Sequence, residues 1–309
     1  MLRCRPDGSF IIAHFTDLHV GYPNNEADRR TLQDLRTCLE TLDADLLMFT
    51  GDQIWCYGDN NPQQGFQQVI DCINTSEIPV VITYGNHDSE HGKITREALR
   101  QMEQGLKNRV FGEQRILTKE RLSELFYIYD STGQHVVKQC VVFDSGDYVS
   151  EKIAQQLTDK NADNCYAYLY TEQVRWLEQT LQPVETAIFL HIPLVEYQEA
   201  KAFIETGQCL EAICSPEINT GLFATLVEHE QAVNVFCGHD HDNDFTAEWL
   251  GVGLHYSRIS GYNVYGQFAR GYRQIILHEQ NALATTIISY DEHKEGKSWQ
   301  KLDKTLKKI

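Results

Sequence analysis

Short apolar runs recur along the chain, and each of them ends in polar side chains. Five runs have the length and composition of buried strands, namely residues 10–15, 45–49, 78–83, 186–190 and 232–237. Leucines at helical spacing predict an amphipathic helix over about 27–42, and Pro62 is well placed to begin a second helix that runs to about Asn74. The alternation of strand and helix predicts parallel strands with right-handed crossovers, whose carboxyl ends share one edge.

The rest of the chain is less regular. Two strands, 126–129 and 135–143, are predicted to pair around a Ser-Thr-Gly turn, while 119–126 is ambiguous. Further helices are predicted over 95–107, 171–181, 195–205 and 222–229, and 150–168 has the character of a long loop or insertion. The glycine-rich stretch 245–290 predicts antiparallel strands that close a second sheet. We expect a single domain over 1–290, followed by a charged tail over 291–309.

The polar residues at the ends of the five apolar runs form the candidate site. They are Asp17-x-His19, Gly51-Asp52, Gly85-Asn86-His87-Asp88, His191 and Gly238-His239-x-His241. Taken alone, Gly85-Asn86-His87-Asp88 is equally well explained as a turn, and a histidine at the end of a single strand is usually just a polar residue at the rim. Five together indicate metal binding, and His, Asp and Asn without cysteine suit Mn, Fe, Zn or Ni. One ion cannot use so many ligands, so two ions bridged by a carboxylate fit better.

Composition narrows the function classes. The net charge of −17 argues against non-specific binding to nucleic acid and against docking on anionic membranes. No apolar run reaches 18 residues, which predicts no membrane span. Nine scattered cysteines without a Cys-x-x-Cys pair are typical of free thiols in a reducing compartment, so we expect a cytoplasmic protein.

In order and spread, the five polar segments resemble the motif blocks of the calcineurin-like metallophosphoesterase family, over about residues 10–265. The resemblance implies a four-layer α/β/β/α sandwich of two mixed sheets. It also implies a hydrolase of phosphate mono- or diesters, in which a hydroxide held between two divalent or trivalent metal ions attacks phosphorus. A non-catalytic module of the same fold, which holds metal as an interaction surface, is the alternative. His87 favours the enzyme, because a non-catalytic relative can lose it and keep its ligands.

The resemblance assigns roles residue by residue. Seven positions correspond to metal ligands: Asp17, His19 and His241 for the first ion, Asp52 between the ions, and Asn86, His191 and His239 for the second. His87 is implied to act near the substrate, as general acid or charge stabiliser. Asp88 is expected to orient His87 through a hydrogen bond. Asn86, His87 and Arg258 are candidate substrate contacts, and for Arg258 a structural salt bridge is the alternative to a phosphate contact.

Within the family, the residues around His239 and the segment 257–262 look most like the intracellular branch related to purple acid phosphatases. Purple enzymes carry a tyrosine ligand three residues after the aspartate of the second block. This chain has Trp55 there, which cannot bind a metal, and it has His19 where purple enzymes have glycine. We therefore expect no tyrosinate-to-iron colour. The substrate, the monoester or diester preference, the metal identity and the oligomeric state stay open.

Overall fold

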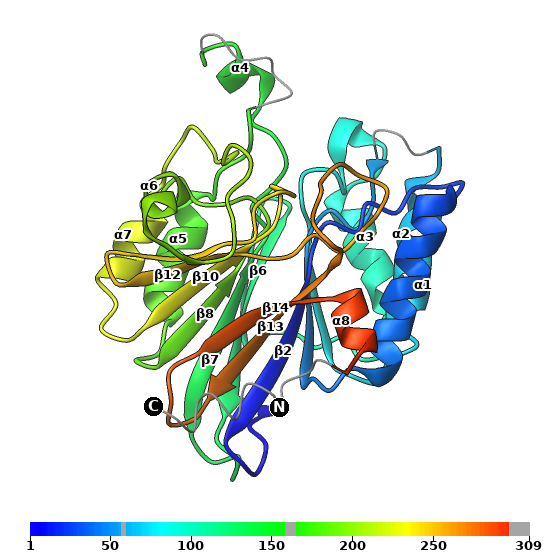
Figure 1. Cartoon of the computed structure of the whole chain (residues 1–309). Helices are drawn as coiled ribbons and strands as arrows, with labels where there is room; N and C mark the ends of the chain where they lie inside the picture. Colours follow the sequence, from blue (N-terminus) through cyan, green and yellow to red (C-terminus); the bar gives the residue numbers. More distant parts are fainter. Residues whose placement is uncertain (57–59, 158–164, 297–309) are drawn as a thin grey trace.

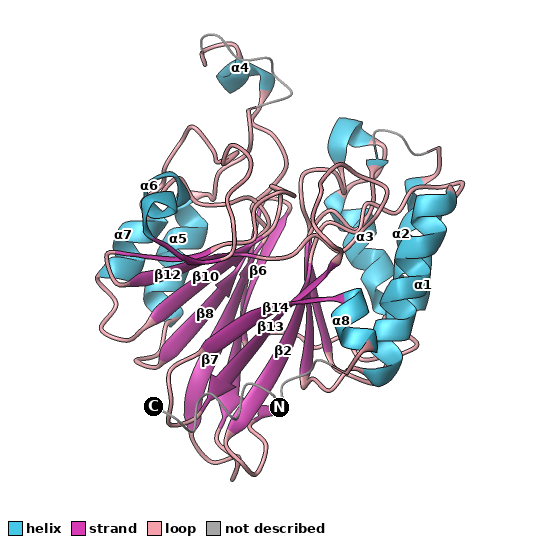
Figure 2. Cartoon of the chain, in the orientation of Figure 1, coloured by secondary structure: helices cyan, strands magenta, loops and turns pink. Residues whose placement is uncertain are grey.

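The protein folds into four layers, helix on sheet on sheet on helix, as a computed structural model shows (Figure 1). The structure describes residues 1–56, 60–157 and 165–296. In Figure 2 the two sheets lie face to face, with α1, α2, α3 and α8 against one and α5, α6 and α7 against the other. The predicted α/β class with two mixed sheets is confirmed.

The smaller sheet carries the first three predicted strands in parallel. Its order is β14-β13-β2-β3-β4, and its strands are β2 Ser9–Phe15, β3 Leu46–Thr50, β4 Val80–Thr83, β13 Gly271–His278 and β14 Ala284–Ser289. The crossovers are the helices α1 Glu26–Thr41 and α2 Pro62–Ile73. A capping box between Asn25 and Asp28 begins α1, and Pro62 occupies the first turn of α2 as predicted. Because β2, β3 and β4 are parallel, their carboxyl ends meet at one edge.

The larger sheet has nine strands among the described residues. They are β1 Leu2–Arg3, β5 Gln114–Thr118, β6 Arg121–Tyr129, β7 Val136–Phe143, β8 Glu185–Phe189, β9 Ile204–Thr206, β10 Val233–Cys237, β11 Thr246–Trp249 and β12 Val252–Tyr256. The ambiguous segment 119–126 becomes part of β6, which pairs antiparallel with β7 as the predicted hairpin requires. β8 and β10 are neighbouring parallel strands, so their carboxyl ends also lie together.

The remaining helices are short: α3 Arg96–Met102, α4 Glu151–Ala154, α5 Thr171–Thr180, α6 Tyr197–Ala200, α7 Leu222–Val227 and α8 Tyr290–Lys294. The helix predicted over 195–205 is interrupted, because it tightens into a 3-10 turn and then joins the sheet edge as β9. The predicted tail begins with α8, whose capping box uses Ser289 and Glu292. The rest of that tail, 297–309, lies outside the described residues.

The stretch 245–290 differs from its prediction. It does not close one sheet; β11 and β12 extend the larger sheet, whereas β13 and β14 extend the smaller one. β12 is moreover parallel to β10, although it pairs antiparallel with β11. The connection between β12 and β13 therefore passes from one sheet to the other, close to the carboxyl ends of both.

Three apolar cores separate the four layers, and β2 shows how one strand serves two of them. Ala13 and Phe15 pack toward α1 and α2, whereas Phe10 and Ile12 pack between the sheets. His14 is buried, and both of its ring nitrogens have partners, the hydroxyls of Thr50 and Ser257 at 2.6 Å each. It is a core histidine, as its position inside the strand predicts.

Among the described residues, no helix combines the length and the apolar character that a membrane crossing requires. The nine cysteines all have free thiols, and seven of these side chains are buried.

Candidate metal centre

The loops that follow β2, β3, β4, β8 and β10 bring the sequence-predicted polar residues together between the two sheets. Two groups form. The first ligand group is Asp17, His19 and His241, and the second ligand group is Asp52, His191 and His239. Within each group the possible ligand atoms lie within 4.8 Å of one another, and all six residues are buried.

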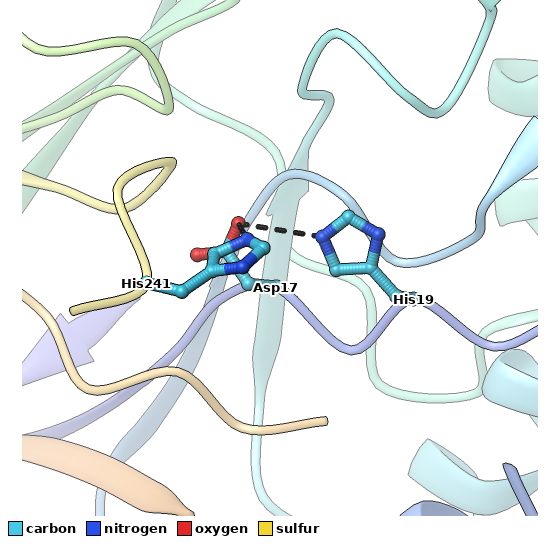
Figure 3. A group of neighbouring side chains, drawn as sticks. All are labelled: Asp17, His19 and His241. Carbon is cyan, nitrogen blue, oxygen red and sulfur yellow. Dashed lines mark ion pairs between the residues drawn. The ribbon is translucent and has the colours of Figure 1, made fainter. Parts of the chain in front are cut away.

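The first ligand group combines the loop after β2 with the loop after β10. Figure 3 shows the two imidazole rings near the carboxylate of Asp17. Asp17 Oδ1 lies 3.8 Å from His19 Nε2 and 3.3 Å from His241 Nε2. These distances leave an imidazole-imidazole-carboxylate set around one point, which is a common ligand set for divalent transition metals.

The second ligand group lies directly beside the first. Asp52 Oδ2 is 3.0 Å from His191 Nε2 and 3.6 Å from His19 Nε2, so this carboxylate faces both groups. The other ring nitrogen of His191, Nδ1, lies 2.9 Å from the carbonyl oxygen of Thr50 and donates to it. That hydrogen bond holds Nε2 toward Asp52, which is how histidine ligands are usually oriented.

Asn86 belongs beside the second ligand group. Its neighbour His87 donates its backbone N–H to Asp52 Oδ1 at 2.8 Å. Its other neighbour, Gly85, approaches so closely that an added β-carbon would lie 2.1 Å from Asp52 Oδ1 and 2.7 Å from the His191 ring. Glycine is therefore required at this position for the loop to reach the site.

All seven predicted ligands have a buried side-chain atom without a hydrogen-bond partner within the described part of the chain. These atoms are Asp17 Oδ1, His19 Nε2, Asp52 Oδ2, Asn86 Oδ1, His191 Nε2, His239 Nε2 and His241 Nδ1. Buried polar atoms are normally paired, because an unpaired one costs about 1–3 kcal/mol. Two bound metal ions would give partners to these seven buried atoms.

The backbone at the site is strained where the ligands are. Asp17, His19, Asp52 and His239 have φ values of 57°, 48°, 52° and 78°. Residues other than glycine rarely adopt this region, and such strain concentrates at functional sites. The loops are fixed in this form by backbone hydrogen bonds such as Asp17 N to Gly51 O at 3.0 Å and His19 N to Asp52 O at 2.9 Å.

Burial acts to lower the pKa values of His19, His191 and His239, whereas the buried carboxylates act to raise them. Burial lowers the pKa of His19 to about 4 and the pKa of His239 well below its usual value. Burial also acts against the charged form of His191, but the carboxylates of Asp52 and Asp17 outweigh it and raise this pKa to about 9. Neutral imidazole is the metal-binding form, and the excess negative charge around His191 favours a bound cation.

Comparisons with known proteins agree with this geometry. The calcineurin-like phosphoesterase family matches residues 10–243, which is most of the chain. The chain belongs to the calcineurin-like phosphoesterase family. Among solved structures, a dimetal phosphatase from Danio rerio superposes with a TM-score of 0.66 at 13% identity, over 91% of this chain and 96% of that one. This likeness shows that the two proteins share the fold.

Three relatives in sequence carry phosphatase names, and two of these are purple acid phosphatase names. A "probable inactive purple acid phosphatase 14" from Arabidopsis thaliana is 28% identical over 98% of this chain and 82% of its own length. A second Arabidopsis relative, "probable inactive purple acid phosphatase 28", is 26% identical over 86% of this chain and 74% of its own. The phosphatase DCR2 of Saccharomyces cerevisiae is 26% identical over 77% of this chain and 45% of its own. The resemblance drawn from the motifs is thus confirmed.

In this calcineurin-like phosphoesterase, His87 lies beside the metal-ligand candidates with its ring partly exposed. Its side chain is 29% exposed, whereas the side chains of the metal-ligand candidates Asp17, His19 and Asp52 are at most 2% exposed. Nδ1 of His87 lies 2.9 Å from Glu90 Oε2, and its ring centroid lies 5.2 Å from that of His19. Burial acts to lower the pKa of His87, but Asp52 and Glu90 raise it above the usual value.

The structure corrects the role expected for Asp88. Its Oδ2 accepts the backbone N–H groups of Asp52 and Gly85, both at 2.8 Å, and its Oδ1 accepts that of Ile54 at 3.0 Å. Asp88 therefore ties the loop after β3 to the loop after β4, and Glu90 takes the place beside His87. Burial and the nearby Asp52 raise the pKa of Asp88 to about 7.

Arg258 forms a structural salt bridge, which was the alternative to a phosphate contact. Its guanidinium pairs with Asp244, donates to the Ala269 carbonyl at 3.2 Å and lies 4.6 Å from the centroid of the Phe268 ring. This set of partners holds the connection between β12 and β13 onto the loop after β10.

Sequence reasoning missed Glu90, Tyr166 and the contact made by Tyr148. Glu90 stands three residues after His87 in a 3-10 turn, a spacing that could have identified it. Tyr148 follows the strand predicted over 135–143, and its hydroxyl accepts a hydrogen bond from the Asn86 side chain. Tyr166 comes from the non-periodic segment 150–168, where no pattern in the sequence distinguishes it from its neighbours.

Proposed function

We propose that this chain hydrolyses phosphate mono- or diesters at a dinuclear metal centre. The observation that carries the proposal is the pair of buried ligand groups, joined by Asp52 and lined with unpartnered atoms, next to the partly exposed ring of His87. The first ligand group would hold one ion. The second ligand group, together with Asn86, would hold the other.

Two such ions, when bound, lower the pKa of a water molecule and neutralise charge on phosphoryl oxygens. The chain's own residues do the rest. Asp52 faces both ligand groups with one oxygen and holds the loop after β4 with the other, so it keeps the two sites in a fixed relation. Burial lowers the pKa values of His19 and His239, so these two rings present neutral nitrogens, which is the form that binds metal.

His87 is the residue placed to help the leaving group. The Glu90 carboxylate lies 2.9 Å from Nδ1 and favours a proton on the partly exposed ring. We assign His87 the transfer of that proton from Nε2 to the leaving oxygen as the ester bond to phosphorus breaks. A positioned general acid of this kind contributes about 10²- to 10⁴-fold in rate.

The test is a screen of aryl phosphate monoesters and diesters with the metal-free chain reconstituted with Mn, Fe, Zn or Ni. We expect metal-dependent hydrolysis of at least one ester class, and chelation should abolish it. The His87→Ala protein, assayed beside it, should bind the same amount of metal and turn over about 10²- to 10⁴-fold more slowly. Undiminished activity in chelator-treated protein would refute the proposal.

The second candidate is a metal-holding interaction module of the same fold. The observation that favours it is the wording "probable inactive" in the names of the Arabidopsis relatives. The two candidates differ at His87, which a metal-holding module does not need. Full metal occupancy without hydrolysis of any ester in the screen would select the module over the enzyme.

A further inference from the structure

The segment between β7 and α5 leaves the body of the protein and returns to the metal centre. Figure 1 shows α4 projecting beyond the carboxyl ends of the strands. At the base of this excursion Tyr148 and Tyr166 pair as an isolated antiparallel bridge. Their rings stack with centroids 5.8 Å apart and an interplanar angle of 26°. Two backbone hydrogen bonds, Val149 N to Cys165 O at 2.9 Å and Ala167 N to Asp147 O at 3.0 Å, fix the pair.

Tyr148 contacts a residue of the candidate metal centre directly. Asn86 donates from Nδ2 to the Tyr148 hydroxyl oxygen at 3.1 Å, and Asn86 Oδ1 is buried without a partner within the described residues. The Asn86 amide has two polar groups, the NH₂ group and the carbonyl oxygen. With its nitrogen held by Tyr148, its oxygen is the atom left to bind a metal ion.

Tyr166 contacts another residue of the same group. Its ring meets the imidazole of His239 edge to face, with centroids 4.3 Å apart and an interplanar angle of 86°. His239 Nε2 is likewise buried and unpartnered within the described residues. The two stacked tyrosines thus act on Asn86 and His239, both on the side of the second ligand group.

The excursion is also fastened to the loop that carries Asn86. Asp147 Oδ2 accepts from the Ser89 hydroxyl at 3.3 Å. Arg96 donates to Ser89 Oγ at 2.7 Å and to the Gly85 carbonyl at 3.0 Å, and it pairs with Asp144 at 3.1 Å. Arg96 is buried, so these contacts are shielded from water. Tyr148 is therefore held in a fixed position relative to Asn86.

We propose that Tyr148, supported by Tyr166, is a positioning residue for the second metal ion, and that it sets the affinity of this site independently of the first. This inference rests on the proposed dinuclear site. Two of the three residues of the first ligand group are positioned differently, since Asp17 and His19 come from one loop and are held by backbone hydrogen bonds. Loss of the Tyr148 hydroxyl should free the Asn86 amide to rotate and weaken only the second ion.

The experiment uses the full chain, stripped of metal and titrated with Mn²⁺ alone. Calorimetry gives the number of ions and their affinities. Electron paramagnetic resonance separates an isolated Mn²⁺ from a pair that lies about 3.5–4 Å apart and couples magnetically. The variants are Tyr148→Phe and, as a matched control, Tyr168→Phe, which removes a hydroxyl two residues from Tyr166, where the ring packs on Tyr170 with centroids 6.2 Å apart.

We expect the wild-type chain to bind two Mn²⁺ ions. In Tyr148→Phe one affinity should stay unchanged and the other should fall about 10- to 100-fold, the usual cost of losing a partner that orients a ligand. The coupled signal should then appear only at higher Mn²⁺ concentration, while Tyr168→Phe should match the wild type. An equal fall at both sites, or no difference between the two variants, would overturn the inference.

Two further outcomes keep the inference and the proposed reaction distinguishable. If the wild type binds two ions, Tyr148→Phe loses affinity at one site, and no ester is hydrolysed, the positioning role stands and the reaction fails. If the wild type binds fewer than two ions, both fail. Thermal unfolding shows whether Tyr148→Phe is folded. If it is not, Tyr166→Ala is titrated in its place. Weaker binding at one site alone then supports the inference, and unchanged affinities at both sites contradict it.

Discussion

The two ligand groups are built in different ways although they share Asp52 and lie side by side. In the first ligand group, Asp17 and His19 are two residues apart in a single loop, and both have left-handed backbone conformations. In the second ligand group, Asp52, His191 and His239 follow three strands from both sheets. There the orienting partners come from elsewhere in the chain, namely the Thr50 carbonyl for His191 and the Tyr166 ring for His239.

The difference concerns which interactions must persist for each ion to bind. In the first group, Asp17 and His19 depend mainly on local backbone geometry, which survives as long as the loop after β2 keeps its hydrogen bonds to the loop after β3. His241 joins them from the loop after β10, where its ring lies 4.2 Å from that of Tyr265 between centroids. The second group depends on contacts between segments more than 100 residues apart, such as His191 with Thr50. Substitutions away from the metals should therefore affect the second ion more than the first.

The largest effect is expected from Asp52→Asn, which removes the charge that faces both groups while keeping the size of the side chain. The second ion should be lost, the first should bind more weakly, and hydrolysis should fall to background. Metal analysis and an ester assay measure this, with Asp71→Asn on the exposed face of α2 as the control. Two tightly bound ions in Asp52→Asn would show that the groups do not share this carboxylate.

A smaller effect is expected from Glu90→Gln, which should lower turnover without changing metal binding. Removing the negative charge 2.9 Å from His87 Nδ1 should lower turnover by roughly 10- to 100-fold, less than the loss of the whole general acid. Metal content should not change, because Glu90 contacts His87 and belongs to neither ligand group. Turnover is compared with that of Glu97→Gln, an exposed change in the first turn of α3. Equal turnover in the two variants would show that Glu90 does not assist His87.

The smallest effect on activity is expected from Arg258→Ala. Its partner Asp244 is only 6% exposed, and an unpaired buried charge there should lower the free energy of unfolding by about 3 kcal/mol. The kcat/KM of the folded protein should stay within about twofold of the wild type, since Arg258 is engaged with Asp244, Ala269 and Phe268. Denaturant unfolding and steady-state kinetics provide the measurement. A large rise in KM with unchanged stability would restore a role in phosphate binding.

The strand ends could be predicted from the sequence because each is a local signal. An apolar run followed by Asp, Asn or His is visible without the fold, and the parallel order of β2, β3 and β4 places Asp17, Asp52 and Asn86 at one edge. The same reasoning reached His191 and His239 through the parallel pair β8 and β10. All seven predicted ligand residues lie where these strand ends meet.

What the sequence did not reveal depends on side-chain direction and on long-range pairing. Asp88 is adjacent to His87, but adjacent residues point apart, and the turn brings Glu90 to the ring instead. Tyr166 reaches His239 from a segment without periodicity. The division of 245–290 between two sheets follows from the connection between β12 and β13 crossing over, which alternation along a strand does not encode.

The proposed hydrolysis of phosphate esters needs two metal ions together, one in each ligand group. Stepwise addition of Mn²⁺ to the metal-free chain, with hydrolysis of an aryl phosphate followed at each step, tests it directly. We expect little hydrolysis up to one ion per chain and a rise that follows occupancy of the second site. Full hydrolysis at one ion per chain or none, or no hydrolysis with two ions bound, would contradict it.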